Sequence, residues 1–82
     1  MIKNINDFQN VFFIGVAGVG MSAIAQYLKG IGKNVSGSDR YFLPETYNKT
    51  KTQLENEGIL CFLQDGSGIT ENTDLIVVST AI

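Results

Sequence analysis

The chain has 82 residues, 44% of them apolar and 17% charged, which fits one small globular domain and excludes a second domain within this length. Its formal net charge is −2, and the basic side chains do not form the stripe that binds a nucleic acid backbone. The single cysteine, Cys61, cannot form an internal disulfide, so we expect a reducing, cytoplasmic setting. No apolar run approaches the roughly 18 residues of a membrane span, so no membrane partner is expected.

The first half of the chain predicts a strand, a helix and a second strand. Residues 11–14 form a continuous apolar run that ends at Gly15, as in a strand covered on both faces. Apolar residues then recur at helical spacings of three and four, in the order Met21, Ile24, Ala25, Leu28 and Ile31. Gly32 stands where a glycine ends such a helix, and residues 34–38 predict the next strand by their position after it.

The second half predicts one more helix and two more strands. Residues 45–56 predict a polar surface helix whose narrow apolar face is chiefly Tyr47 and Leu54. Residues 59–63 and 75–78 predict strands, the latter an aliphatic run covered on both faces. Consecutive βαβ units define an α/β fold, a Rossmann-like parallel sheet of about four strands with flanking helices. A covering helix normally follows the fourth strand of such a sheet, so we expect the domain to be truncated at its C-terminus.

A glycine-rich turn, residues 15–20, separates the first strand from the first helix. Backbone amides at a helix start have no intrahelical partner, and the helix dipole adds partial positive charge, so a diphosphate can bind there without a lysine. Asp39 ends the second strand roughly 20 residues after the loop, where a carboxylate can accept hydrogen bonds from ribose hydroxyls. Together these features predict a nucleotide diphosphate site.

Other interpretations of the same turn stay open. Ala17 occupies the second glycine position of the GxGxxG fingerprint, where its methyl group is expected to crowd a dinucleotide's pyrophosphate. The alternative function is nevertheless an NAD(P)-binding module of an oxidoreductase or regulatory protein. Met21 replaces the lysine of an ATP-hydrolysing P-loop, which argues against that class. The glycines would also suit a tight turn with close helix packing and no ligand.

Residues after the second and fourth strands are further candidates for the site. Arg40 could reach a phosphate, and Tyr41 and Phe42 could stack on a base. The hydroxyls of Ser79 and Thr80 follow the fourth strand, at the carboxyl edge where open α/β sheets bind ligands. The sequence has no histidine and no visible acid/base pair or metal cluster, so it predicts neither catalytic nor metal-binding residues.

Three separated segments resemble the start of the Mur ligases of peptidoglycan synthesis. They are residues 13–25, Phe-Ile-Gly-Val-Ala-Gly-Val-Gly-Met-Ser-Ala-Ile-Ala; residues 35–39, Val-Ser-Gly-Ser-Asp; and residues 78–82, Val-Ser-Thr-Ala-Ile. The sequence departs from the family pattern at Ala17, where glycine is usual, and at Phe12, where histidine is common.

The resemblance implies that residues 1–82 are the N-terminal, UDP-sugar-binding domain of a larger cytoplasmic ligase. Such ligases use ATP and magnesium to turn the carboxylate of UDP-N-acetylmuramate into an acyl phosphate, which the amine of L-alanine attacks; a murein-tripeptide-recycling ligase of the same family is the alternative. The family's Gly-Lys-Thr ATP loop is absent here, so this chain alone is expected to bind its UDP-sugar without catalysis, with the remaining ligase domains as partners. The residues predicted to meet the UDP moiety are Gly15, Ala17, Gly18, Val19, Gly20, Met21, Ser22, Ser38, Asp39, Arg40, Ser79, Thr80 and Ala81.

Overall fold

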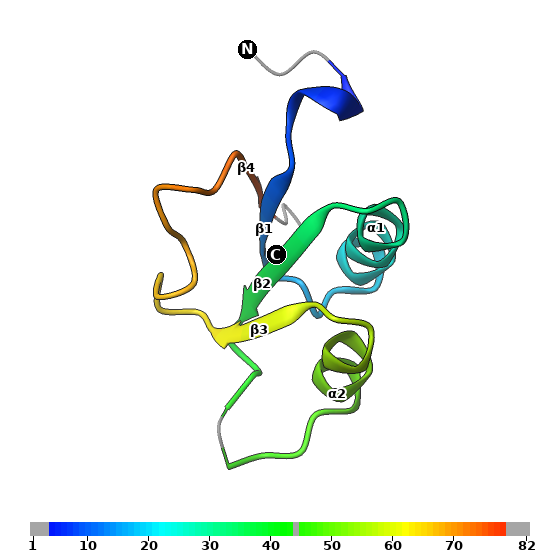
Figure 1. Cartoon of the computed structure of the whole chain (residues 1–82). Coiled ribbons are helices and arrows are strands. Elements are labelled where there is room, and N and C mark those ends of the chain that lie inside the picture. The colour runs from blue at the N-terminus through cyan, green and yellow to red at the C-terminus, as the bar shows by residue number, and fades with distance from the viewer. Residues whose placement is uncertain (1–3, 44, 79–82) are drawn as a thin grey trace.

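The computed structural model describes residues 4–43 and 45–78, which form a four-stranded parallel sheet with two helices (Figure 1). The sheet has the order β3-β2-β1-β4, and in chain order its strands are β1 (Asn10–Ile14), β2 (Asn34–Asp39), β3 (Leu60–Leu63) and β4 (Leu75–Val78). The helices are α1 (Val19–Gly30) and α2 (Lys49–Asn56), and a short 3-10 turn, η1 (Ile5–Asp7), precedes the sheet. The predicted Rossmann-like α/β fold is confirmed.

Both helices lie on the same face of the sheet (Figure 1). The hydrophobic core lies between this face and the helices and consists of Val11, Phe13, Val16, Ala25, Leu28, Val35, Phe42, Leu54 and Ile59. Helix α1 contributes Ala25 and Leu28, whereas Ile24 and Ile31 are nearly half exposed, so the buried stripe is narrower than the predicted one. Gly32 follows the helix with φ of 99° and is the predicted terminating glycine.

Helix α2 begins later than predicted and is anchored more deeply. The Asn48 side chain accepts a hydrogen bond from the backbone N–H of Lys51 at 3.0 Å, which makes Asn48 the N-cap and starts the helix at Lys49 rather than at residue 45. Tyr47 therefore precedes the helix and is exposed. Leu54 is fully buried, so α2 packs into the core through this side chain.

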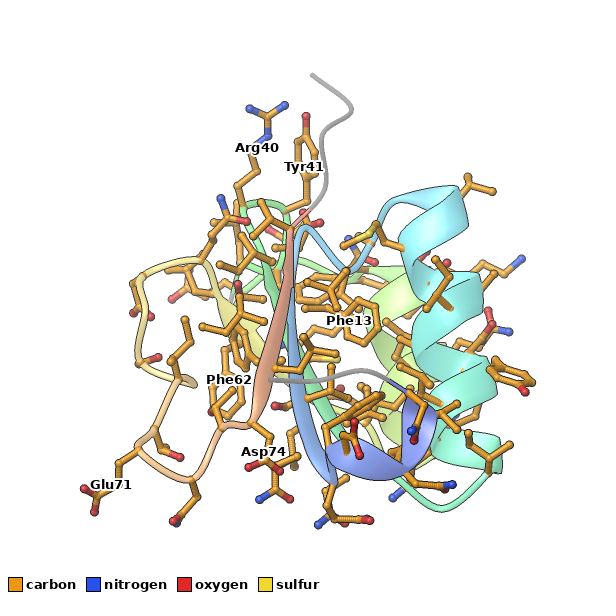
Figure 2. The ribbon with its side chains drawn as sticks, turned by 90° about the horizontal axis from the view of Figure 1, so that it is seen from above. Phe13, Arg40, Tyr41, Phe62, Glu71 and Asp74 are labelled. Carbon is orange, nitrogen blue, oxygen red and sulfur yellow. The ribbon has the colours of Figure 1, made fainter. Side chains whose placement is uncertain are left out.

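The opposite face of the sheet is covered by the segment between β3 and β4, residues 64–74 (Figures 1 and 2). The rings of Phe12 and Phe62 lie on this face with their centroids 6.2 Å apart. A Cβ atom at Gly68 would lie 2.5 Å from both rings, so only glycine lets the segment pack this closely. This packing buries β1 on both faces, as predicted.

Strand β4 is covered less completely than predicted. Its side chains alternate, with Leu75 and Val77 partly buried toward the helices and Ile76 and Val78 exposed on the other face. The reason is that β4 is an edge strand of the described sheet, and both helices lie on the face that Leu75 and Val77 share. The expectation of cover on both faces is wrong for the residues that the structure describes.

The strand register brings the ends of β1, β2 and β4 to one edge. Ile14, the last residue of β1, pairs with Ser38 of β2 and with Val78, the last residue of β4. The strand order reverses between β1 and β4, which is the switch point where open α/β sheets bind ligands.

At the opposite end of the sheet, Asp74 accepts hydrogen bonds from the backbone N–H groups of Asn10 and Gln9, which lower the pKa of its carboxyl (Figure 2).

At Gly37 of β2, the chain that follows β1 packs directly against the sheet. An added Cβ would lie 2.7 Å from Cβ of Val16, whose side chain is completely buried. We therefore expect Gly37→Ala to lower the free energy of unfolding by about 1–3 kcal/mol, measured by urea denaturation. The control is Gly20→Ala, because nothing lies within 4 Å of a Cβ at Gly20.

The same contact predicts that shortening Val16 rescues Gly37→Ala. In a Val16→Ala background the alanine at position 37 should cost clearly less than in the wild-type background, because the two side chains compete for one space. Equal stability of Gly37→Ala and the wild type would contradict this packing.

Candidate functional site

The glycine loop between β1 and α1 is held at the end of β2 by backbone hydrogen bonds. Gly15 has φ of 87°, a conformation that favours glycine, and turns the chain out of β1. Its N–H and the N–H of Val16 both donate to the carbonyl oxygen of Ser38, at 2.8 and 3.0 Å. Ser38 is almost fully buried, and its carbonyl oxygen makes the contact with the loop.

The Asp39 carboxylate adds a second link between the loop and β2. One oxygen accepts the N–H of Ala17 at 3.0 Å, and the other accepts the N–H of Tyr41, also at 3.0 Å. Only 6% of Asp39 is exposed. In this structure the carboxylate therefore joins two backbone segments, and its predicted contact with a ribose stays a prediction.

Three backbone amides at the start of α1 are left without a partner. Gly18 donates to the carbonyl of Gly15 at 3.2 Å, and Ser22 makes the first helical bond, to the carbonyl of Gly18 at 2.8 Å. Between them, the amides of Val19, Gly20 and Met21 have no acceptor among residues 4–43 and 45–78. The first turn of α1 contains no acidic side chain to offset the positive end of the helix dipole. The arrangement fits an anion with several oxygens.

Two predicted site residues have side chains that contact other parts of this chain. Ala17 is half-buried and packs against the core, so its methyl group fills core space instead of crowding the loop's outer surface. The Ser22 hydroxyl donates back to the carbonyl of Val19 at 3.1 Å.

The remaining predicted side chains lie at or beyond the carboxyl edge of the sheet. Arg40 is exposed and lies against Tyr41, with its guanidinium carbon 5.0 Å from the ring centroid. Phe42, a proposed base-stacking residue, is fully buried in the core and is unavailable to a ligand. The predictions for Ser79, Thr80 and Ala81 fall outside the described residues.

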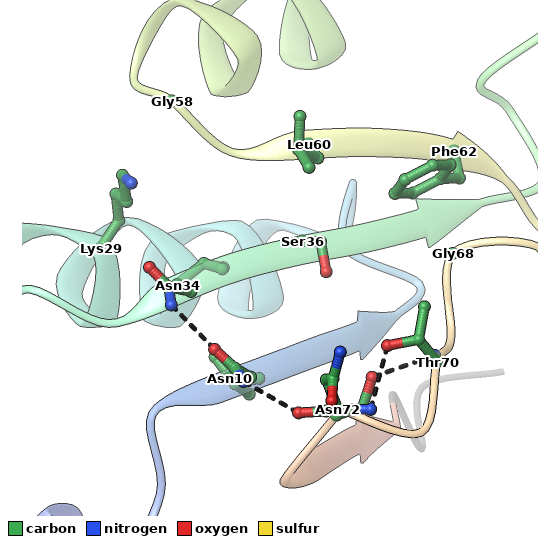
Figure 3. A pocket seen from close by; sticks show the side chains of 13 residues that line it. Asn10, Lys29, Asn34, Ser36, Gly58, Leu60, Phe62, Gly68, Thr70 and Asn72 are labelled. Atoms are coloured by element: carbon green, nitrogen blue, oxygen red, sulfur yellow. Dashed lines mark hydrogen bonds between the residues drawn. The ribbon is translucent and has the colours of Figure 1, made fainter.

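A groove of about 510 Å³ lies at the other edge of the sheet (Figure 3). It is lined by the first residues of β1 and β2, Asn10 and Asn34, and by the segment before β4. The Asn34 amide donates to the Asn10 side chain at 2.8 Å, and Asn10 donates to the carbonyl of Asn72 at 2.9 Å. These groups lie at the amino ends of the strands, whereas the glycine loop follows the carboxyl end of β1. The groove is therefore separate from the glycine loop.

Cys61 and the acidic side chains of the described residues do not form a second site. Burial, and next the nearby Glu55 carboxylate, raise the pKa of the Cys61 thiol to about 11, so it is protonated at neutral pH. Within residues 4–43 and 45–78, no three histidine, cysteine or acidic side chains gather as metal ligands would. In that same part of the chain, neither helix has the length and apolar character to cross a bilayer.

A parallel sheet with a switch point beside a glycine loop, followed by a helix with unpaired amides, places the chain in the class of Rossmann-like α/β domains. Comparison with protein families narrows the class, because the model described as "Mur ligase family, catalytic domain" matches residues 10–82. The chain belongs to the Mur ligase family, as its resemblance predicted.

Curated relatives are similar over nearly the whole chain. A UDP-N-acetylmuramate–L-alanine ligase of Flavobacterium psychrophilum is 39% identical over 96% of this chain and 18% of its own length. Enzymes of the same name from Rickettsia canadensis and Campylobacter jejuni subsp. jejuni are 42% and 40% identical, over 99% and 90% of this chain and 16% of their own lengths. The chain thus spans less than a fifth of the length of these relatives.

Proposed function

We propose that this chain is the UDP-sugar-binding domain of a cytoplasmic, ATP-dependent ligase that joins L-alanine to UDP-N-acetylmuramate in peptidoglycan synthesis. The observation that carries the proposal is the run of three unpaired amides, Val19 to Met21, at the start of a 12-residue helix. The relatives, whose names specify this substrate and L-alanine, support the choice of ligand.

The amides would bind the diphosphate between uridine and sugar. Its oxygens carry two negative charges at neutral pH, one on each phosphate, and hydrogen bonds to charged groups are stronger than those between neutral groups. Fixed N–H donors at a helix start need no rearrangement when the anion arrives. The hydrogen bonds from Gly15 and Val16 to Ser38, and from Ala17 to Asp39, hold the loop in the conformation that presents them.

ATP and magnesium do not fit the residues described here. The side chain after Gly20 is Met21, whose thioether cannot neutralise phosphate charge as a P-loop lysine does. Magnesium that accompanies ATP is usually held by one or two carboxylates together with the phosphates, so it belongs where the ATP phosphates bind. We therefore assign ATP, magnesium and the amide-forming step to other domains of the parent ligase.

Calorimetric titration of the chain with UDP-N-acetylmuramate, and separately with NADH, tests the proposal. We expect saturable binding of the UDP-sugar and none of NADH. UMP-N-acetylmuramate analogues that lack one phosphate should bind more weakly, because they offer fewer oxygens to the three amides. Binding of NADH without binding of the UDP-sugar would instead favour the dinucleotide-binding alternative.

A further inference from the structure

Helix α1 exposes an apolar face to solvent. Ile24, Tyr27 and Ile31 are 48%, 62% and 46% exposed, and Ala23 and Gly30 are exposed beside them. Because successive residues of an α-helix are about 100° apart, these five residues share an arc of roughly 120°. None of them carries a charge, whereas the outer face of a surface helix is normally charged or polar. We refer to these five residues as the α1 face.

The α1 face contains a glycine that packing within residues 4–43 and 45–78 does not require. A Cβ atom at Gly30 would meet nothing within 4 Å among these residues. Gly30 belongs to α1 and is not among the glycines with positive φ, so no left-handed conformation requires it. Glycine weakens a helix relative to alanine. A glycine that leaves a recess on an apolar helix face fits the close approach of another helix.

A two-fold axis through Tyr27 makes the α1 face complementary to itself. When two copies of α1 pack antiparallel about this axis, residues at equal distances before and after Tyr27 lie opposite each other. Ile24 then faces Gly30 of the second copy, and Ile31 faces Ala23 of the second copy. Each large side chain meets a small residue, as interdigitating helices require, and the two Tyr27 rings meet at the axis.

The charge of the α1 face also suits a second copy. The chain has a net charge of −2, so two copies repel each other over most of their surface. On the α1 face no charged side chain of one copy would meet a like charge of the other. In the antiparallel arrangement, the positive end of each helix dipole also lies beside the negative end of the other.

The area of the α1 face sets the expected strength of the contact. A 12-residue helix is about 18 Å long and 10–12 Å wide, so one face offers on the order of 200–400 Å² per copy. A stable complex buries roughly 800 Å² per partner. We therefore expect a dimer that forms only at high protein concentration.

We propose that the α1 face is the contact through which two copies of this chain form a weak antiparallel dimer with its two-fold axis at Tyr27. Helix α1, cyan in Figure 2, lies at the outer side of the molecule, where a second copy can reach it. The inference does not depend on the proposed function, because dimerisation is measured without a nucleotide.

Analytical ultracentrifugation of the chain between about 10 μM and about 1 mM tests the proposal. The wild-type chain should be monomeric at the lowest concentration and increasingly dimeric as the concentration rises. Tyr27→Lys places two positive charges at the axis and should weaken dimerisation more than about 10-fold. The matched control is Tyr47→Lys, because Tyr47 is 77% exposed and lies outside α1, so this variant should dimerise like the wild type.

A mixture of two variants tests the position of the axis. Neither Tyr27→Lys nor Tyr27→Glu should dimerise alone, but their equimolar mixture should, because the axis places position 27 opposite itself. Gly30→Gln fills the recess that receives Ile24 and should also weaken dimerisation, while the urea midpoint of the monomer stays the same or rises, since glutamine favours a helix. A wild-type chain that stays monomeric at 1 mM, dimers that Tyr27→Lys does not weaken, or a mixture that does not associate would overturn the proposal.

Discussion

Asp39→Ala is expected to lower the free energy of unfolding by about 3 kcal/mol, because each hydrogen bond to a charged group contributes roughly 1.5–3 kcal/mol and water can replace part of the loss. The substitution removes the acceptor of both the Ala17 N–H and the Tyr41 N–H in a position that is 6% exposed. The free energy of unfolding of a domain of this size is small, so the loss should be visible as a large drop in the midpoint of urea denaturation.

Two further variants define this effect. Asp39→Asn keeps one oxygen acceptor but turns an N–H donor toward the other amide, so its stability should fall between those of the wild type and Asp39→Ala. Asp65→Ala is the matched control, because the exposed Asp65 carboxylate accepts hydrogen bonds from Ser67, within its own turn, and does not link distant segments. If Asp39→Ala were as stable as Asp65→Ala, the carboxylate would not hold the loop.

The sequence predicted the strands well because each one is signalled locally. The aliphatic run of residues 75–78 coincides with β4, and the weakly apolar residues 34–38 lie within β2, one residue short of its end. Gly32 was predicted as the residue that terminates α1, because the signal, a glycine at the end of a helical apolar pattern, involves neighbours in sequence. The start of α2 was missed although its signal, the capping residue Asn48, was also local.

The contacts that shape the site could not be predicted, because they join residues far apart in sequence. The Asp39 carboxylate accepts the N–H of Ala17, 22 residues earlier, a contact that no local pattern signals, and its predicted contact with a ribose stays a prediction. A close approach that requires a glycine occurs at Gly37, against Val16, and another at Gly68, but none at Gly20, where the space is open. A glycine pattern alone does not show which of its glycines are required by close packing. Only the three-dimensional structure shows which glycines lie against other residues.

The central claim is that unpaired amides at the start of α1 bind the diphosphate, and Val19→Pro removes one of them with little other change. Proline is well tolerated at the first position of a helix, and Gly18, with φ of −61° and ψ of 145°, already has the backbone conformation that a residue before proline adopts. Val19 is 90% exposed, so no core packing is lost. The free energy of unfolding should therefore stay close to that of Val19→Ala, which retains the N–H.

The decisive measurement is calorimetric titration of UDP-N-acetylmuramate into Val19→Pro and Val19→Ala. We predict that Val19→Ala binds like the wild type, whereas Val19→Pro binds roughly 10- to 150-fold more weakly, the equivalent of about 1.5–3 kcal/mol for one hydrogen bond to a charged group. Equal affinity of the two variants, with both chains folded, would contradict a diphosphate site at these amides.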